Sequence, residues 1–217
     1  SMDNDLSKRC PVCYKSGKFI FKSRNKHSVY KCLNDKCGHF WVPEYTKDQL
    51  FFEREENMEN ESNNNLKVFG ERNKELLKLI LKTILVRKEY KFLDFGSGCA
   101  HISRTFKREL RETVKIFCID SNEQCKLFYP KWGLVPIEEI KQINEKIDFI
   151  YLIEVIEHLE NPFNVLCNLK DILSKEGMIL ISTPPGYNNE NDTNAYEEKT
   201  HIQFFTNKSL NVLLEKV

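Results

Sequence analysis

Two different spacings of apolar residues divide the chain near residue 90. Apolar positions between residues 66 and 88 recur at helical spacing, which predicts an amphipathic helix. From residue 91 onward, short continuous apolar runs alternate with amphipathic segments. Continuous runs are typical of a parallel sheet that helices cover on both faces. The expected strands are 91–96, 115–120, 147–154 and 178–184, and the expected helices are 101–110, 122–129, 161–173 and 206–217.

The first 65 residues follow neither pattern. Residues 10–42 combine cysteines, lysines and aromatic residues with short β-like runs, residues 46–61 predict a charged helix, and the Asn-rich residues 62–66 predict a turn. We therefore expect a small domain over 1–45, a helical linker over 46–65 and a main domain over 66–217. The predicted fold class is α/β, with a Rossmann-like, mostly parallel sheet after a small metal-binding domain.

Charge is unevenly distributed, although the net charge is only +1. Residues 1–50 hold 8 Lys and 2 Arg against 4 Asp and 1 Glu, which gives +5 and leaves −4 for the rest. A solvated lysine-rich surface is our preferred interpretation, with a nucleic-acid patch as the alternative.

No apolar run approaches the roughly 20 residues of a membrane span, and the N-terminus lacks a signal-like apolar segment. We expect a cytoplasmic protein without a membrane partner; its oligomeric state stays open.

Four of the eight cysteines form a metal-binding pattern. Cys10 and Cys13 are separated by two residues, and after 18 more residues come Cys32 and Cys37. Two thiolate pairs on tight turns can close a tetrahedron around Zn²⁺, and four cysteines leave no open coordination position. The sequence therefore predicts a structural zinc ribbon. His39 stays open as a replacement for Cys37, because the second pair has a wider gap than usual.

A glycine-rich turn follows the first expected strand. Gly96 permits a sharp turn, Gly98 lets a ligand approach the backbone, and Ala100 occupies the third small position before a helix. Asp120 ends the next expected strand, where a carboxylate can bind ribose hydroxyls. These features suit a dinucleotide almost as well as an adenosyl sulfonium. Asp94 favours the sulfonium, because a carboxylate at this strand end suits a cation better than a pyrophosphate.

The series of motifs along residues 66–217 resembles the class I S-adenosylmethionine-dependent methyltransferases, particularly the ubiquinone-type and sugar methyltransferases. DFGSGCA and CIDSN resemble the first two family motifs, IDFIYLIEVIEHLENP resembles the strand with its EHL-x-x-P continuation, and EGMILISTPP and HIQFFTNKSL resemble the later segments. The family usually has a seven-stranded sheet that ends in a β-hairpin. This sequence stops where that hairpin is expected, so we expect the terminal strands to be absent or the domain to be truncated.

The resemblance implies S-adenosylmethionine as cofactor, with structural zinc in the ribbon, and a set of site residues. Its cofactor residues would be Asp94, Phe95, Gly96, Ser97, Gly98, Asp120, Ser121, Ile153, Glu154, Val155 and His158. His201 and His158 are the candidates for a catalytic base, since histidine is the usual proton acceptor for an oxygen or nitrogen nucleophile. The adenine-side segment around Ile137 and Glu138 lacks the family's acidic signature.

Three functions are compatible with these observations. The first is methyl transfer to a small-molecule acceptor, such as a sugar, a sugar nucleotide or a quinone-like compound, on oxygen or carbon. The second is an RNA methyltransferase that holds nucleic acid with the basic zinc ribbon and its aromatic residues. The third is a non-catalytic binding protein with a partial methyltransferase fold. The EHLENP and HIQFFT segments favour the first function.

Overall fold

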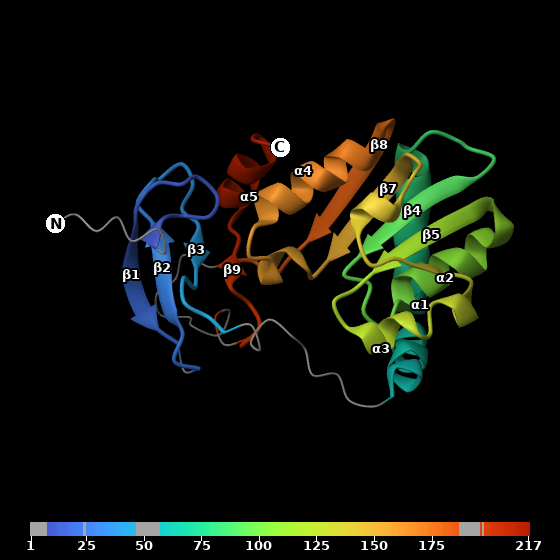
Figure 1. The fold of residues 1–217 in the computed structure, drawn as a ribbon, viewed down its shortest axis with the longest axis horizontal. Coiled ribbons are helices and arrows are strands. Elements are labelled where there is room, and N and C mark those ends of the chain that lie inside the picture. Colours follow the sequence, from blue (N-terminus) through green and yellow to red (C-terminus); the bar gives the residue numbers. More distant parts are fainter. Residues whose placement is uncertain (1–7, 24, 47–56, 187–195, 197) are drawn as a thin grey trace. The chain divides into compact units, whose positions relative to one another are not determined.

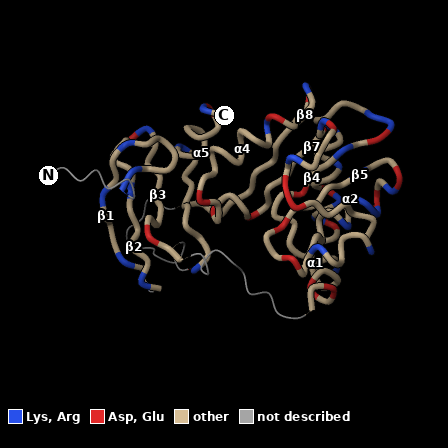
Figure 2. The backbone as a smooth tube through the Cα atoms, in the orientation of Figure 1, with Lys and Arg blue, Asp and Glu red and all other residues tan. Residues whose placement is uncertain are grey.

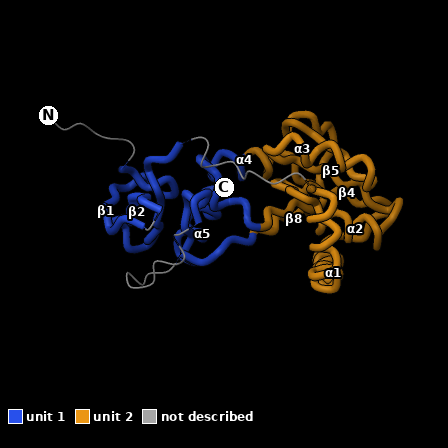
Figure 3. Tube along the Cα trace, turned by 90° about the horizontal axis from the view of Figure 1, so that it is seen from below, with its two compact units in different colours: residues 1–52, 154–167, 182–217 blue, residues 53–153, 168–181 orange. Residues whose placement is uncertain are grey.

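The structure is a computed structural model, which describes residues 8–23, 25–46, 57–186, 196 and 198–217. Its contacts divide the chain into two compact units (Figure 3). Unit 1 takes its residues from Ser1–Phe52, Glu154–Cys167 and Ser182–Val217, and unit 2 from Glu53–Ile153 and Asn168–Ile181. The domain boundaries at residues 45 and 65 stay predictions from the sequence.

Unit 2 is built on a five-stranded sheet with the order β6-β5-β4-β7-β8 (Figure 1). The pairs β4–β5, β4–β7 and β5–β6 are parallel. The α/β class with a mostly parallel sheet is thus confirmed, with five strands in the part of the chain described here instead of the seven of the resembling family. The strands are β4 (Tyr90–Phe95), β5 (Val114–Ile119), β6 (Val135–Pro136), β7 (Ile147–Ile153) and β8 (Leu173–Ser182).

Helices follow most strands as the apolar pattern predicts, but the segment expected as a helix over 122–129 is helical only over Glu123–Lys126. The α-helices are α1 (Met58–Thr83), α2 (His101–Leu110), α3 (Glu123–Lys126) and α4 (Pro162–Ile172), and short 3₁₀ turns occur at η3 (Arg111–Thr113), η4 (Pro130–Trp132), η5 (Ile140–Gln142) and η6 (Ile156–His158). Helix α1 packs on α2, where Arg104 donates hydrogen bonds to Ser62 and Asn63. The strands bury their side chains on these helices; Phe92 of β4, for example, lies against Phe106 of α2 and is fully buried.

Two local predictions were wrong. The Asn-rich residues 62–66 lie inside α1 rather than in a turn, because the helix begins at Met58 with Asn57 as its N-cap and with Glu59 and Glu61 in the first turn. The strand expected over 178–184 is β8, which begins five residues earlier, at Leu173, directly after α4. Of the predicted helix 46–61, residues 47–56 lie outside the described part of the chain.

Unit 1 contains an antiparallel sheet with the order β1-β2-β3-β9. The strands are β1 (Gly17–Lys22), β2 (Ser28–Cys32), β3 (Phe40–Trp41) and β9 (Gln203–Phe204), and α5 (Asn207–Leu214) follows β9. Phe40 of β3 pairs with Phe204 of β9, and both lie in one apolar cluster with Val29, Tyr196 and Ile202. A segment more than 160 positions further along the chain therefore completes the sheet of the cysteine-rich region.

No helix among the described residues has both the length and the apolar character that a membrane crossing requires.

Candidate cofactor and acceptor site

The loop after β4 adopts backbone conformations that its small residues permit. Gly96 and Gly98 have φ values of 77° and 48°, in the left-handed region that favours glycine. Ala100 also lies there, with φ of 53°, so the third small position carries backbone strain. The backbone N–H groups of Gly96 and Ser97 donate to the carbonyl oxygen of Ile119, at N···O distances of 2.8 and 3.1 Å. The loop is thereby fixed to the carboxyl end of β5.

Asp120 joins this loop to the end of β5. Its Oδ2 accepts a hydrogen bond from the backbone N–H of Gly98 at 2.7 Å, and its Oδ1 accepts from the N–H of Asn122 at 2.8 Å. Each carboxylate oxygen keeps a second lone pair for a ligand. The neighbouring Ser121 is exposed. The structure thus brings the predicted acid and the predicted glycine loop together.

Asp94 lies beneath the loop and is 5% exposed. Its Oδ2 accepts a hydrogen bond from the Ser103 hydroxyl at 2.6 Å, and this hydroxyl lies 2.5 Å from the Tyr151 hydroxyl. Burial raises the pKa of Asp94 to about 7, the Ser103 hydrogen bond opposes this rise, and the charge of Asp120 adds to it. A cation near this carboxylate would favour its ionised form.

Tyr129, which the sequence pattern did not indicate as a site residue, holds the glycine loop through its hydroxyl group. Its hydroxyl donates to the carbonyl oxygen of Gly98 at 2.8 Å and accepts from the Ser97 hydroxyl at 3.0 Å. The side chain is fully buried, and burial raises its pKa further above the ordinary range. Tyr129 is the last residue of the segment 122–129, which the sequence predicts only as a helix. The apolar pattern therefore gave no indication of this contact.

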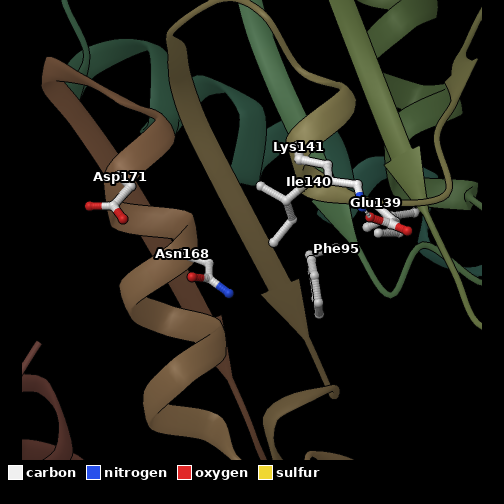
Figure 4. Close-up of a pocket in the computed structure, with 7 residues that line it drawn as sticks. Phe95, Glu139, Ile140, Lys141, Asn168 and Asp171 are labelled. Carbon is white, nitrogen blue, oxygen red and sulfur yellow. Dashed lines mark ion pairs between the residues drawn. The ribbon is translucent and has the colours of Figure 1, made fainter.

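A pocket of about 490 Å³ lies in unit 2 (Figure 4). Its lining comes from the ends of β4 and β5, from η5 and its neighbour Glu139, and from α4: Phe95, Ile119, Glu139, Ile140, Lys141, Asn168 and Asp171. Glu139 and Lys141 form an ion pair at its rim. Phe95 is the one predicted cofactor residue among these lining residues. Together with Ile119 and Ile140, it supplies the apolar part of the lining, beside the loop.

The chain leaves β7 through a strained residue. Ile153 ends the strand in unit 2, and Glu154 begins the next segment of unit 1 with φ of 55°, a conformation that costs energy for a residue with a side chain. Glu154 is exposed; its backbone N–H donates to the Ser182 carbonyl oxygen, and the Ser182 hydroxyl donates to its Oε1 at 2.5 Å. Val155, which follows, is half-buried. Strain of this kind is often held at functional sites.

Both predicted catalytic histidines lie within unit 1, beside Glu157. Their rings are 4.7 Å apart between centroids, and His201 Nε2 and His158 Nε2 lie 3.9 and 4.0 Å from Glu157 Oε1. Burial, and then the neighbouring His158, lower the pKa of His201 to about 4, so its imidazole is neutral at neutral pH. Burial also raises the pKa of Glu157 to about 7, with a smaller effect from Glu154. Glu157 was not among the predicted site residues.

The four predicted metal ligands converge. The sulfur atoms of Cys10 and Cys37 are 3.8 Å apart and those of Cys13 and Cys32 are 3.3 Å apart, and all four lie within 4.8 Å of one another. Zn–S bonds of about 2.3 Å in a tetrahedron separate sulfur atoms by about 3.8 Å, so the cluster fits zinc. Gly38 has φ of 60°, as a knuckle turn requires.

His39 is not part of this cluster. Its Nε2 lies 2.8 Å from Gln203 Oε1 and its Nδ1 lies 3.2 Å from the Ser209 hydroxyl, so both ring nitrogens are engaged with the C-terminal segment. The side chain is fully buried, which lowers its pKa to about 4. The alternative in which His39 replaces Cys37 is therefore disfavoured, because its nitrogens are directed to other partners.

Comparison with known proteins identifies the larger part of the chain. A family model described as "Methyltransferase domain" matches residues 56–217. A search of curated proteins gives no significant match.

Several solved structures share the fold. The plantazolicin methyltransferase BpumL, solved in complex with SAH, is 20% identical with a TM-score of 0.52, over 71% of this chain and 66% of that chain. A SAM-dependent methyltransferase from Archaeoglobus fulgidus is 20% identical with a TM-score of 0.51, over 67% of each chain. A chain from the complex of the Haloferax volcanii Trm112 methyltransferase activator and a putative methyltransferase is 14% identical with a TM-score of 0.53, over 75% of this chain and 76% of that chain. The present chain spans slightly less than two thirds of the BpumL chain.

Proposed function

We propose that this chain, which belongs to the methyltransferase-domain family, transfers the methyl group of S-adenosylmethionine to a small-molecule acceptor. The observation that carries the proposal is the hydrogen bond of 2.7 Å from the Gly98 N–H to Asp120 Oδ2, which builds a ligand cradle from two strand ends. Ligands of parallel α/β sheets bind at the carboxyl ends of the strands. The acceptor class proposed is a sugar, sugar nucleotide or quinone-like compound, methylated on oxygen or carbon.

The residues of the cradle suit the cofactor's chemistry. Asp120 would accept hydrogen bonds from the ribose hydroxyls of the cofactor. Gly96 and Gly98 would let the cofactor approach the backbone closely, and the carboxylate of Asp94 would attract the cationic end of the cofactor. Phe95, Ser97, Ser121, Ile153, Glu154, Val155 and His158 complete the proposed set. When bound, S-adenosylmethionine supplies an activated methyl group. Because Asp94 has a pKa raised to about 7, binding of a cation beside it would release a proton from this carboxyl group.

The protein's own contribution is to orient the acceptor and to manage its proton. His201 and His158 are half-buried beside the buried carboxyl group of Glu157, which gives a proton acceptor in a site with little water. A neutral His201 can take a proton from an acceptor hydroxyl, and Glu157 would stabilise the resulting imidazolium. Positioning of the nucleophile in line with the activated methyl group would supply much of the rate enhancement.

Zinc in the cysteine cluster is proposed as a structural component. Cys10, Cys13, Cys32 and Cys37 would fill its coordination sphere and leave no position for a substrate. The cysteine-rich region has a small apolar core, so bound zinc would contribute much of its folding free energy. We further propose a cytoplasmic location, where free thiols persist.

RNA is the second candidate acceptor, and one surface favours it. Lys18 of β1 and Lys31 of β2 are directly paired across the antiparallel strands, and like charges at such positions repel each other unless an anion intervenes. Phe19, in the same pair of strands, is 52% exposed and stacks edge-on against Tyr30. Lysine positions recur along these two strands (Figure 2). Lysines with exposed aromatic rings suit single-stranded nucleic acid.

A transfer assay with methyl-labelled S-adenosylmethionine tests the proposed acceptor class. The chain is incubated with a low-molecular-weight metabolite extract or with total RNA, each with and without ribonuclease. Label in small organic products supports the proposal, whereas ribonuclease-sensitive label supports the RNA alternative. In the second case, RNA affinity should fall steeply with salt, and Lys18→Gln should reduce that salt dependence. A chain that binds cofactor but labels neither pool would favour a non-catalytic role.

A further inference from the structure

A carboxyl group and two imidazole groups lie close together in unit 1, and proton transfer during methylation does not account for all three. Glu157 and His158 belong to η6, and His201 lies two residues before β9. Glu157 Oε1 lies 3.9 Å from His201 Nε2 and 4.0 Å from His158 Nε2. One donor atom from each residue lies within 4.8 Å of the other two. The chain brings these groups together through the hydrogen bond from the Ile202 N–H to the Glu157 carbonyl oxygen.

The carboxyl group of Glu157 lacks hydrogen-bond partners among the described residues. Its side chain is 1% exposed, and neither Oε1 nor Oε2 accepts a hydrogen bond. The hydroxyl of Thr183 faces this carboxyl group closely enough to lower its pKa, but the two groups do not reach hydrogen-bond geometry. Buried polar atoms are nearly always hydrogen-bonded, and an exception indicates a water molecule or an ion that satisfies them.

The orientation of His158 suits a metal ligand. Its Nδ1 lies 2.9 Å from the Thr200 carbonyl oxygen, and because a carbonyl can only accept, Nδ1 carries the hydrogen. In the tautomer with this hydrogen, the lone pair is on Nε2, which lies 4.0 Å from Glu157 Oε1. Histidine ligands of metals usually donate their other N–H to a carbonyl or a carboxylate in this way.

We propose that Glu157, His158 and His201 bind a divalent first-row transition-metal cation. Two imidazole nitrogens and one carboxylate oxygen suit manganese, iron, cobalt, nickel or zinc better than magnesium, which prefers oxygen ligands alone. Donors bound at about 2.1 Å to one cation lie about 3.0 to 3.4 Å apart, so the Glu157–histidine separations of 3.9 and 4.0 Å must shorten by about 0.5 to 1 Å. The cation would satisfy the unpaired carboxylate and offset the cost of its burial.

This site differs in kind from the cysteine cluster. Three protein ligands leave coordination positions open, as in catalytic metal sites, whereas four thiolates close the sphere. An oxygen atom of the methyl acceptor could occupy an open position and become easier to deprotonate, which would replace proton transfer to a metal-free His201. That role rests on the proposed function, but metal binding itself does not.

Manganese titration tests the site directly. The full chain is first loaded with one equivalent of Zn²⁺ to occupy the thiolates, and free Mn²⁺ is then followed by electron paramagnetic resonance. Wild type should bind one Mn²⁺ per chain, and Glu157→Gln and His201→Gln should each bind it at least tenfold more weakly. His101→Gln, a histidine change in α2, is the matched control and should bind Mn²⁺ like wild type. Thermal unfolding shows which variants are folded. If Glu157→Gln does not fold, the Mn²⁺ affinity of His201→Gln decides the result.

Equal Mn²⁺ affinity in the four proteins, or no binding by wild type at millimolar Mn²⁺, would overturn the metal site. Calorimetry with S-adenosylhomocysteine on the same samples separates this result from the proposed function. Binding of S-adenosylhomocysteine without binding of Mn²⁺ would contradict only the metal site. Mn²⁺ binding without cofactor binding supports the metal site and contradicts methyl transfer.

Discussion

The backbone N–H of Gly98 donates a hydrogen bond to Asp120 Oδ2 across 2.7 Å, and this bond joins the loop after β4 to the end of β5. Tyr129 adds a second restraint, because its hydroxyl donates to the carbonyl oxygen of the same glycine at 2.8 Å. Both polar groups of the Gly98 backbone are therefore held by side chains. The loop is organised before any ligand arrives, which lowers the entropic cost of binding.

Removal of the Tyr129 hydroxyl should weaken this organisation. Tyr129→Phe leaves the Gly98 carbonyl oxygen and the Ser97 hydroxyl without this partner in a buried place. We expect a loss of about 1 to 3 kcal/mol in the free energy of unfolding, measured by urea denaturation. Tyr14→Phe is the control, since Tyr14 is 53% exposed and its change should stay within about 0.5 kcal/mol. Equal effects of the two substitutions would show that the buried hydroxyl contributes nothing specific.

Asp94 should make stability depend on pH in the absence of ligand. Its pKa in the folded protein is about 7, above the ordinary 3.8, so the protonated form favours folding. This contribution is complete below about pH 4 and is lost as pH rises through 7, by up to about 4 kcal/mol. Asp94→Asn stays neutral, so the stability difference between wild type and variant should fall over this range. A difference that is constant between pH 4 and 8 in urea denaturation would contradict the raised pKa.

The ligand set of the proposed zinc site can be tested with two substitutions. Cys37→Ser should lower the zinc content from one per chain to near zero, because a thiolate ligand is lost. His39→Gln should keep one zinc per chain, since both His39 nitrogens contact Gln203 and Ser209 instead. Atomic absorption on purified proteins measures both. Zinc loss in His39→Gln alone would mean that His39 is the fourth ligand.

Zinc removal should affect the two units differently. The Val42 N–H donates to the Ile202 carbonyl oxygen in unit 1, next to the pairing of β3 with β9. After chelation, this amide should exchange hydrogen at least tenfold faster, because the cysteine-rich region depends on zinc for folding. The amides of β4 in unit 2 are the internal control and should keep their protection. Equal loss in both units would indicate a single cooperative folding unit.

Prediction from the sequence succeeded where the pattern is local. Continuous apolar runs gave the strands β4, β5 and β7, and the cysteine spacing gave a cluster whose sulfur atoms do converge. The pairing of β3 with β9 was not predictable, because β9 is two residues long and its partner lies far away in the sequence. Glu157 was missed for a similar reason: its acid-rich segment looks exposed, and only the fold buries its side chain.

The central claim, that the cradle of Gly98 and Asp120 binds S-adenosylmethionine, is tested most directly by titration calorimetry with S-adenosylhomocysteine on the folded, zinc-loaded chain. Wild type should bind one equivalent, and Asp120→Ala should bind at least tenfold more weakly, because it loses the proposed ribose contact and the bond to Gly98. Exposed Glu75→Ala, in α1, should bind like wild type. No binding by folded wild type, or equal affinity in Asp120→Ala, would contradict the account.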